Sequence, residues 1–396
     1  MRTSPRFDIQ RVRLLHYRSI KTCDVRLADL TVLVGPNGSG KSNFVDSLRL
    51  VSQALSENLD NALRERGGAA EVRRRSNGHP THFTIQLDFA GDGFTGSFMF
   101  KVGAAKGGDY RVTHEKCSVR TTSEMADADA FYEVRDGHLV ASSFDTVLPP
   151  GVDDRLYLVQ ASAIPAFRRV FDGLSDVNVY NLNPGSMRMP QRPEAGDLLR
   201  RDGANIASVL EHLSRVAPET KTKVEDYLRL VVPGTIAANR VSYGAYESVE
   251  FRQRVEGRDD AWTFPATSMS DGTLRALGIL VALFAPGSSG FSPIAVEEPE
   301  TALHPAAAGL LLEALQSASR DRQILATSHS PELLDSNGLG PENILAVRAV
   351  DGVTTISPVD DVTANALRDN TFTAGELLRV DQLQPSVPFD QPGLFG

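Results

Sequence analysis

An eight-residue glycine-rich segment constrains the fold of this chain more than any other feature of its 396 residues. The segment Gly35-Pro36-Asn37-Gly38-Ser39-Gly40-Lys41-Ser42 matches the phosphate-binding pattern G-x-x-x-x-G-K-[ST] at every fixed position. It follows the apolar run 30–34, which is typical of a buried parallel strand. Apolar residues on one helical face come after it: Phe44, Leu48, Val51, Leu55 and Leu59. The sequence therefore predicts a strand–loop–helix unit within an α/β fold.

The residue types of this segment suit a bound nucleotide. Glycines let successive backbone N–H groups face phosphate oxygens at the N-terminus of the following helix, where the helix dipole also favours anions. Lys41 can neutralise charge on the β- and γ-phosphates, and the hydroxyl of Ser42 can bind Mg²⁺. We therefore expect phosphate binding at residues 35–42, and we include the adjacent Asn43 among the nucleotide-binding candidates.

Composition restricts the class of protein. The chain carries 41 Lys or Arg and 50 Asp or Glu, a formal charge of -9, with 41% hydrophobic and 23% charged residues. These ordinary globular values argue against global disorder. A membrane-embedded body is not expected either, because the longest apolar run, 277–285, is far shorter than a spanning helix. Two cysteines and the absence of a secretory signal predict a cytoplasmic protein. Net acidity weighs against indiscriminate coating of nucleic acid, although it leaves a local basic patch open.

A second apolar strand, 293–296, ends in two acids, Glu297 and Glu298. Phosphoryl transfer needs a carboxylate on the metal side and a group that positions water. We expect Glu297 to hold Mg²⁺ through water and Glu298 to act as the base toward the attacking water. Paired acids directly after a buried strand are costly unless they meet a metal or another cation, which favours this functional interpretation.

Two further segments carry candidate residues. The buried strand 323–327 leads into Ser328-His329-Ser330-Pro331, which places His329 at a carboxyl strand end, where doubly wound sheets bind ligands. There His329 can donate a hydrogen bond to the γ-phosphate. Ser270 and Gly272 precede the apolar helix 274–285, and they suit either an ordinary helix cap or an anion site for a phosphate delivered by another subunit. The spacing does not decide between these two.

We divide the chain into five parts. Residues 1–61 are expected to form the N-terminal half of a nucleotide-binding head, 62–158 a β-rich insertion, 159–265 a helical insertion with returning strands, and 266–380 the C-terminal half of the head. Residues 381–396 lack periodicity and are expected to be disordered. No heptad stretch predicts an extended coiled-coil arm.

Taken together, these motifs resemble the ABC-type ATPases of the RecF, SMC and OLD lineage, and more closely the stand-alone AAA-family ATPases. The resemblance covers most of the chain, with 62–158 similar only in general character. It implies a P-loop ABC-type head with a mixed or parallel sheet and flanking helices. It rests on residues 35–42, Tyr17-Arg18-Ser19-Ile20, Ser270-Asp271-Gly272, Glu297-Glu298-Pro299-Glu300, Leu303-His304-Pro305 and Thr327-Ser328-His329-Ser330.

The resemblance also implies roles for single residues. Lys41 and Ser42 would bind ATP and Mg²⁺, Glu298 would be the catalytic base, and His329 the switch histidine. The signature residues Ser270, Asp271 and Gly272 would contact ATP held by the opposite subunit of a homodimer. Arg18 would lie near the nucleotide, and Gln160, with Gln191 as its rival, would be the metal-side glutamine.

Departures from the family pattern narrow the function. Ser-Asp-Gly-Thr at 270–273, where transporters have Ser-Gly-Gly-Gln, favours a non-transporter branch. OLD nucleases carry a C-terminal Toprim domain with several metal-binding acids. The residues after His329 are too few for such a domain, and Asp360-Asp361 does not supply enough acids. We therefore expect any nuclease or toxin activity to belong to a separate effector protein.

The first functional hypothesis is an ATP-hydrolysing homodimeric switch that acts on DNA or controls an effector, in anti-phage defence or DNA repair. Candidate contacts to double-stranded DNA are Arg64, Arg66, Arg73, Arg74, Arg75, Arg188, Arg192, Arg200 and Arg201. The alternative is an ATPase subunit that energises a membrane transporter, which leaves the 255 positions between Ser42 and Glu297 unexplained. A GTPase or small-molecule kinase is a third class, and the chain has no Asn-Lys-x-Asp guanine motif.

Overall fold

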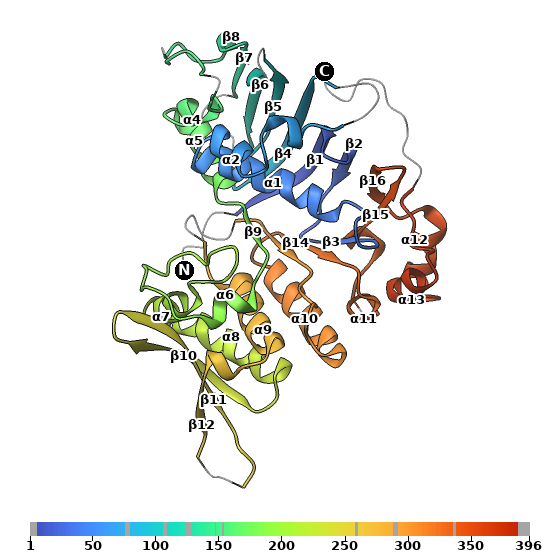
Figure 1. Ribbon diagram of the computed structural model, residues 1–396. Helices are drawn as coiled ribbons and strands as arrows, with labels where there is room; N and C mark the ends of the chain where they lie inside the picture. The colour runs from blue at the N-terminus through green and yellow to red at the C-terminus, as the bar shows by residue number, and fades with distance from the viewer. Residues whose placement is uncertain are drawn as a thin grey trace.

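The computed structural model has a mixed α/β architecture built on one large sheet (Figure 1). The structure describes residues 6–75, 80–105, 109–122, 129–146, 148–152, 154–257, 260–287, 292–335 and 338–386. The 13-stranded sheet has the order β8-β7-β6-β5-β4-β1-β2-β16-β15-β3-β14-β13-β9, and a separate 3-stranded sheet has the order β10-β11-β12. The predicted α/β fold with a mixed sheet and flanking helices is confirmed.

Five parallel strands form one half of the large sheet: β15 (Ile344–Val350), β3 (Leu30–Val34), β14 (Ile324–Ser328), β13 (Ile294–Glu297) and β9 (Asn178–Tyr180). Alternate residues of each strand enter two different hydrophobic cores. Leu33 lies in the core on one face of the sheet, whereas Val32 and Val34 lie in the core on the other face. Burial on both faces explains why these strands read as continuous apolar runs in the sequence.

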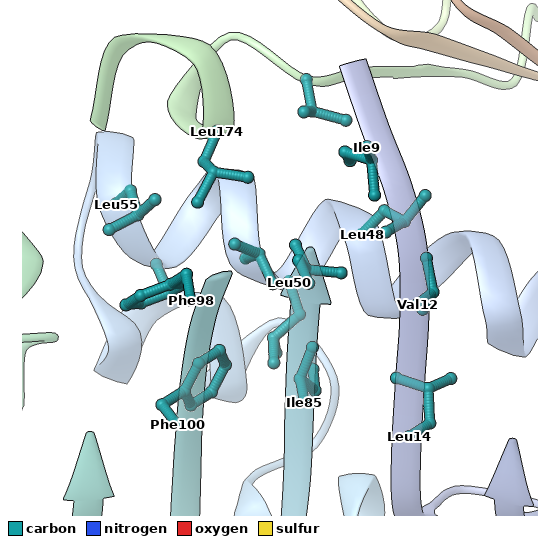
Figure 2. Packing of buried hydrophobic residues seen from close by; sticks show 14 of the residues in the cluster. Ile9, Val12, Leu14, Leu48, Leu50, Leu55, Ile85, Phe98, Phe100 and Leu174 are labelled. Carbon is teal, nitrogen blue, oxygen red and sulfur yellow. The ribbon is translucent and has the colours of Figure 1, made fainter. Parts of the chain in front are cut away.

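The other half of the sheet is antiparallel except where β16 pairs parallel with β2. Its strands are β1 (Phe7–Tyr17), β2 (Ile20–Arg26), β4 (His82–Gly91), β5 (Phe94–Ala104), β6 (Tyr110–Thr121), β7 (Ala130–Arg135), β8 (His138–Ser142) and, next to β15, β16 (Val353–Pro358). The expected β-rich insertion therefore extends the main sheet, since β4 pairs directly with β1. Helix α1 (Lys41–Ser56) lies across this half, with Leu48 and Leu55 packed toward Ile9, Ile85 and Phe98 (Figure 2).

Helices cover the two faces of the sheet. Beside α1 lie α2 (Leu59–Arg64), α3 (Ala69–Val72), α4 (Leu158–Ala161) and α5 (Pro165–Ser175). The other core contains α6 (Pro184–Arg188), α7 (Ile206–Val216), α8 (Pro218–Val231), α9 (Asp271–Phe284) and α10 (Ala308–Ser319). Strands β10 (Thr235–Tyr243), β11 (Tyr246–Gln253) and β12 (Trp262–Pro265) project from this side (Figure 1). The remaining helices are α11 (Pro331–Leu334), α12 (Asp361–Arg368) and α13 (Ala374–Arg379), with 3-10 turns η2 (Ala266–Ser268), η3 (Pro305–Ala307) and η4 (Pro341–Asn343).

Three boundaries differ from the sequence-based expectations. Leu59 begins a separate helix, because the side chain of Asn58 accepts a hydrogen bond from the Asn61 amide and caps α2. Strand β9 belongs to the main sheet, although it lies inside the region expected to be a helical insertion. Residues 381–386 are attached to the fold, since Asp381 N donates to Leu378 O at 3.1 Å and Ser386 N donates to Pro358 O at 3.0 Å. The rest of the expected disordered tail, 387–396, lies outside the described residues.

Candidate nucleotide site

The carboxyl ends of the parallel strands meet at one edge of the sheet. In the register of these strands, Val34 pairs with Ser328, and Thr327 pairs with Glu297. Gly35, His329 and Glu298 follow directly at the same edge. The glycine-rich loop, the paired acids and the histidine, which are far apart in the sequence, are therefore brought together by the register of three adjacent strands.

The glycine-rich loop wraps around the ammonium of Lys41. Lys41 Nζ donates to Gly35 O at 2.7 Å and to Pro36 O at 3.0 Å, and the lysine is 5% exposed. Burial lowers the pKa of Lys41, while the charges of Glu298 and Glu300 oppose that shift. Gly38 and Gly40 have left-handed φ values of 76° and 105°, which non-glycine residues rarely adopt. The loop thus holds a buried cation in a backbone cradle that requires glycine.

These residues fit a triphosphate with Mg²⁺. Within the described ranges, the hydroxyl of Ser39 is buried and has no hydrogen-bond partner, so it is available to an oxygen-rich ligand. Ser42 is exposed at the start of α1, and nothing lies within 4 Å of the position a Cβ on Gly38 would take. Mg²⁺ in nucleotide sites is usually held by one or two protein groups together with phosphate oxygens. Ser42 and Glu297 are the groups that would hold it here.

The tight turn between β1 and β2 is linked to the glycine-rich loop by hydrogen bonds. Ser19 Oγ accepts a hydrogen bond from Asn43 Nδ2 at 2.6 Å and lies 2.7 Å from Thr354 Oγ1, which in turn donates to Ser39 O at 2.8 Å. Arg18, with a left-handed φ of 48°, forms a 3.0 Å ion pair with Asp46 in α1. Asn43 therefore contacts the turn, and Arg18 anchors that turn to the first helix.

Glu298 adopts a left-handed backbone conformation, with φ 46°, immediately after β13. Its amide donates to Thr327 O and Thr327 Oγ1, each at 3.1 Å, and its carbonyl accepts from Arg275 Nη2 at 3.0 Å. These contacts hold a conformation that is unfavourable for a side chain with a Cβ. The carboxylate lies 3.4 Å from His329 Nδ1, and both side chains are more than one-third exposed. The predicted base and switch histidine are thus in contact and accessible.

Glu300 links the two loops that carry Glu298 and His329. Its Oε1 accepts from Ser328 Oγ at 2.6 Å and from the His329 amide at 3.3 Å. Glu298, Glu300, His304 and His329 line one pocket of about 410 Å³ next to this contact. The arrangement fixes the backbone of the histidine relative to the acidic turn.

Glu297 forms an ion pair with Arg201, at 3.1 Å between Oε1 and Nη2. The Glu297 side chain is 12% exposed, whereas the Arg201 side chain is 42% exposed. Asn181 follows β9, whose last residue, Tyr180, pairs with Val296, so Asn181 lies level with Glu297 at the sheet edge. Asn181, Arg201 and Arg275 line a second, shallower pocket at this edge. Burial within the apolar helix α9 lowers the pKa of Arg275.

The signature segment is a helix start in this chain. Ser270 Oγ accepts from the Thr273 amide at 3.1 Å and caps α9, and Asp271 pairs with Arg188 at 2.6 Å. A Cβ on Gly272 would lie only 2.4 Å from Ala302 O, so packing against the loop after Glu298 requires glycine. Within its own chain, Ser270 thus contacts Thr273, Asp271 contacts Arg188 in α6, and Gly272 packs against Ala302. Their predicted contact with a nucleotide on another subunit stays a prediction.

The structure does not bring Gln160 to the glycine-rich loop. Gln160 lies in α4 and donates to Pro150 O at 3.4 Å. The preceding segment contacts the start of α2, just past the far end of α1, where Asp154 O accepts from the Leu59 amide. Since α1 has 16 residues, about 24 Å of helix separate that end from Lys41. Gln191 pairs through its backbone with Glu247, beside β11, so neither glutamine lies at the predicted metal position.

The arginines considered for DNA contact do not form a free basic face. Arg66 is 8% exposed and its guanidinium pairs with Asp46, while Arg74 is 9% exposed and donates to Ser19 O. These two are structural residues. Ion pairs also engage most of the others: Arg64 with Asp60, Arg75 with Glu71, Arg188 with Asp271, Arg200 with Glu194, and Arg201 with Glu297.

Sequence reasoning missed three residues at this edge. Arg275 gave a signal, since a charge within the apolar run 274–285 needs a partner, which proves to be the backbone of Glu297 and Glu298. Asn181 gave none, because β9 has only 3 residues and no readable period. Arg201 was noted only as a possible DNA contact, since its pairing with Glu297 spans 96 positions.

No helix in the described part of the chain is both long and apolar enough to cross a membrane. A search of curated proteins finds no match to the sequence. Two solved structures show the same fold. The chain matches an Smc head bound to the C-terminal winged-helix domain of ScpA with TM-score 0.55 and 13% identity, over 90% of this chain and 99% of the other. It matches an Smc head with an extended coiled coil, bound to the C-terminal domain of ScpA and derived from Pyrococcus furiosus, with TM-score 0.52 and 12% identity, over 92% and 99%.

The family comparison agrees with the site described above. A model described as "AAA domain, putative AbiEii toxin, Type IV TA system" matches residues 30–135 and 183–335, which together exceed half of the chain. These ranges contain the glycine-rich loop, the signature segment, the paired acids and His329. The Smc head matches show that the sheet and helices are arranged as in an Smc head. The chain therefore belongs to this AAA-domain family, and it has the fold of an Smc head.

Proposed function

We propose that the chain binds ATP with Mg²⁺ and hydrolyses it. The observation that carries this proposal is the contact between Glu298 and His329 at the sheet edge that also bears the loop around Lys41. A carboxylate with a histidine beside it, next to a buried lysine in a phosphate cradle, matches the requirements of phosphoryl transfer to water. The family match supports nucleotide binding of this type.

The chain's own groups would divide the work as follows. Lys41 exchanges its contacts with Gly35 O and Pro36 O for phosphate oxygens, and the backbone amides of the loop bind the same oxygens. Glu298 accepts a proton from the attacking water, while His329 donates a hydrogen bond to the γ-phosphate. Mg²⁺, when bound, would neutralise developing charge on the phosphates. Ser42 and Glu297 would hold that ion.

The proposal includes a homodimer in which Ser270 and Gly272 of one subunit complete the site of the other. It is supported by the signature segment, whose contacts within its own chain run to Arg188, Thr273 and Ala302 and leave the start of α9 partly exposed. Isolated Glu298→Gln protein should therefore change from monomer to dimer when ATP is added. A Ser270→Arg change in the same background should abolish that ATP-dependent mass increase in light scattering.

For the partner, we propose an effector protein in a toxin–antitoxin or anti-phage system. The family description names a putative toxin and a type IV system. The two similar Smc heads were solved with a domain of a second protein, ScpA, which supports protein docking on a head of this fold. The candidate DNA arginines are largely buried or paired, and the net charge is -9, so DNA is the weaker candidate.

The decisive experiment is steady-state ATP hydrolysis by the purified protein, with and without linear double-stranded DNA, at two salt concentrations. Glu298→Gln serves as the blank. Hydrolysis that requires Glu298 and ignores DNA supports the effector proposal. Salt-sensitive stimulation by DNA would replace the effector with DNA as the direct trigger. Absence of hydrolysis above the blank, in all conditions, would refute the ATPase proposal.

A further inference from the structure

The ion pair between Arg201 and Glu297 has no place in the reaction described above. Glu297 ends β13 and is the carboxylate expected on the metal side, yet in this structure its Oε1 contacts Arg201 Nη2 at 3.1 Å. The carboxylate is largely buried, so its charge requires a cation close by. Arg201 meets that requirement from a loop 96 positions earlier in the chain.

The loop that carries Arg201 is tied to the sheet edge by its backbone. Asn181 N donates to Arg201 O at 3.0 Å, and Asn183 N donates to Asp202 O at 3.0 Å. These two bonds join the loop to the segment that follows β9. These bonds position the guanidinium of Arg201 next to Glu297. The same loop continues directly into α7 at Ile206.

Arg201 lies close enough to Arg49 for their positive charges to repel each other. Burial lowers the pKa of Arg49 in α1, and the positive charge of Arg201 lowers it further, so the two guanidinium groups repel each other. Arg49 has carboxylates of its own, with Glu65 at 2.7 Å. Attraction to Glu297 holds Arg201 in place against this repulsion. A divalent cation at Glu297 would remove that attraction and add a second repulsion.

We propose that Arg201 is a latch: it neutralises Glu297 until Mg²⁺ arrives with the nucleotide, and the metal then displaces it. This inference rests on the proposed function, because it assigns Glu297 to the metal side of an ATP site. Its consequence is directional. Metal binding removes the side-chain contact between the loop at 200–203 and β13, and this loop leads into α7, which packs against β10 and β11 of the projecting sheet (Figure 1). Arg201 is a positioning residue, not a catalytic one.

The chain provides a matched control at the preceding position. Arg200 is adjacent, carries the same charge, and pairs with Glu194 instead of Glu297. Arg201→Ala and Arg200→Ala therefore remove equal charge from the same loop, but only the first removes the contact with Glu297. Both are made in the Glu298→Gln background, so that bound nucleotide is not consumed. Circular dichroism melting checks that both variants fold.

The measurement is the Mg²⁺ concentration that gives half-maximal binding of a fluorescent ATP analogue. We expect Arg201→Ala to lower that concentration about fivefold, the effect of losing one partly exposed ion pair, and Arg200→Ala to change it by less than about twofold. Adding Glu297→Gln should cancel the effect of Arg201→Ala, since the latch then has no partner. In the Glu298→Gln parent, hydrogen exchange at 199–206 should rise with Mg²⁺ and analogue but not with analogue and a chelator.

The outcomes separate the two proposals. Analogue binding with equal Mg²⁺ dependence in Arg201→Ala and Arg200→Ala would overturn the latch and leave the nucleotide site intact. A higher Mg²⁺ requirement in Arg201→Ala would also overturn it, and would make Arg201 a direct ligand of the nucleotide. A parent that binds no analogue at any Mg²⁺ concentration would refute the proposed function itself.

Discussion

Gly40 gives the sharpest structural prediction, because both its backbone and its surroundings exclude a side chain. Its φ is 105°, and a Cβ placed on it would lie 2.2 Å from Thr354 Oγ1 and 2.7 Å from Thr354 Cγ2. Thr354 is 1% exposed and cannot move away freely. Gly38 has a similar left-handed φ of 76°, but nothing lies within 4 Å of its Cβ position. Gly40→Ala and Gly38→Ala therefore differ mainly in the collision with Thr354.

The expected loss of stability follows from these contacts. A left-handed backbone costs an alanine about 1–2 kcal/mol at either position. Displacing Thr354 also weakens its bonds to Ser39 O and Ser19 Oγ, at about 1 kcal/mol each. Gly40→Ala should thus lower the free energy of unfolding by about 3–4 kcal/mol, and Gly38→Ala by about 1–2 kcal/mol.

Urea unfolding followed by circular dichroism, in nucleotide-free buffer, measures both values. A third variant, Thr354→Ala, isolates the cause: Gly40→Ala should cost less in that background, because the two nearest atoms are gone. If Gly40→Ala is no more destabilising than Gly38→Ala, the collision with Thr354 does not determine the requirement for glycine. The reasoning about the loop would then be wrong, whatever the nucleotide affinity of the variants.

Three further outcomes are expected. Glu298→Gln should lower kcat for ATP hydrolysis at least about 100-fold while the affinity for a fluorescent ATP analogue changes little, because the base acts only on water; equal losses in both would contradict its role. Burial raises the pKa of Glu115 to about 7, against the opposing effect of hydrogen bonds from Tyr132, Tyr157 N and Leu158 N. The folded protein then binds more protons than the unfolded chain between about pH 4.5 and 7, so stability should fall by up to about 3 kcal/mol as pH rises through that window. Urea midpoints at several pH values test this, and Glu115→Gln should flatten the slope. Arg66→Ala should destabilise the protein by about 3 kcal/mol, since it removes the buried guanidinium that donates to Asp46, Gln53 Oε1 and Ala62 O at about 1 kcal/mol each, whereas Arg64→Ala should cost less than about 0.5 kcal/mol. Thermal melting compares the two, and equal effects would show that the 64–75 segment is not anchored as described.

Much of the nucleotide site was predictable because its parts are local. The loop at 35–42, the acids after β13 and the histidine after β14 each follow a buried strand, and buried strands leave readable apolar runs. Parallel strands have their carboxyl ends at one edge, so these three segments had to meet if the strands were neighbours. The structure places β3, β14 and β13 side by side.

Other features could not be read from the sequence because they depend on pairing over long separations. The basic segment 64–75 has the composition of a solvated face, but Arg66 and Arg74 are buried against Asp46 and Ser19 O. Gln160 has the residue type of a metal ligand but lies beyond the far end of α1. In both cases the residue type was compatible with two environments, and only the packing of distant elements selected one.

The sequence by itself determined the strand–loop–helix unit, the glycines with positive φ, and the acidic and histidine strand ends, because each is set by steric and hydrogen-bonding rules within a few residues. Tertiary structure decided which cation neutralises Glu297, which glutamines and arginines lie near the nucleotide loop, and which strand completes the sheet edge. A charge pair such as Arg201 and Glu297 depends on the distance between two atoms, and that distance is fixed only when β9, β13 and the loop before α7 are packed together.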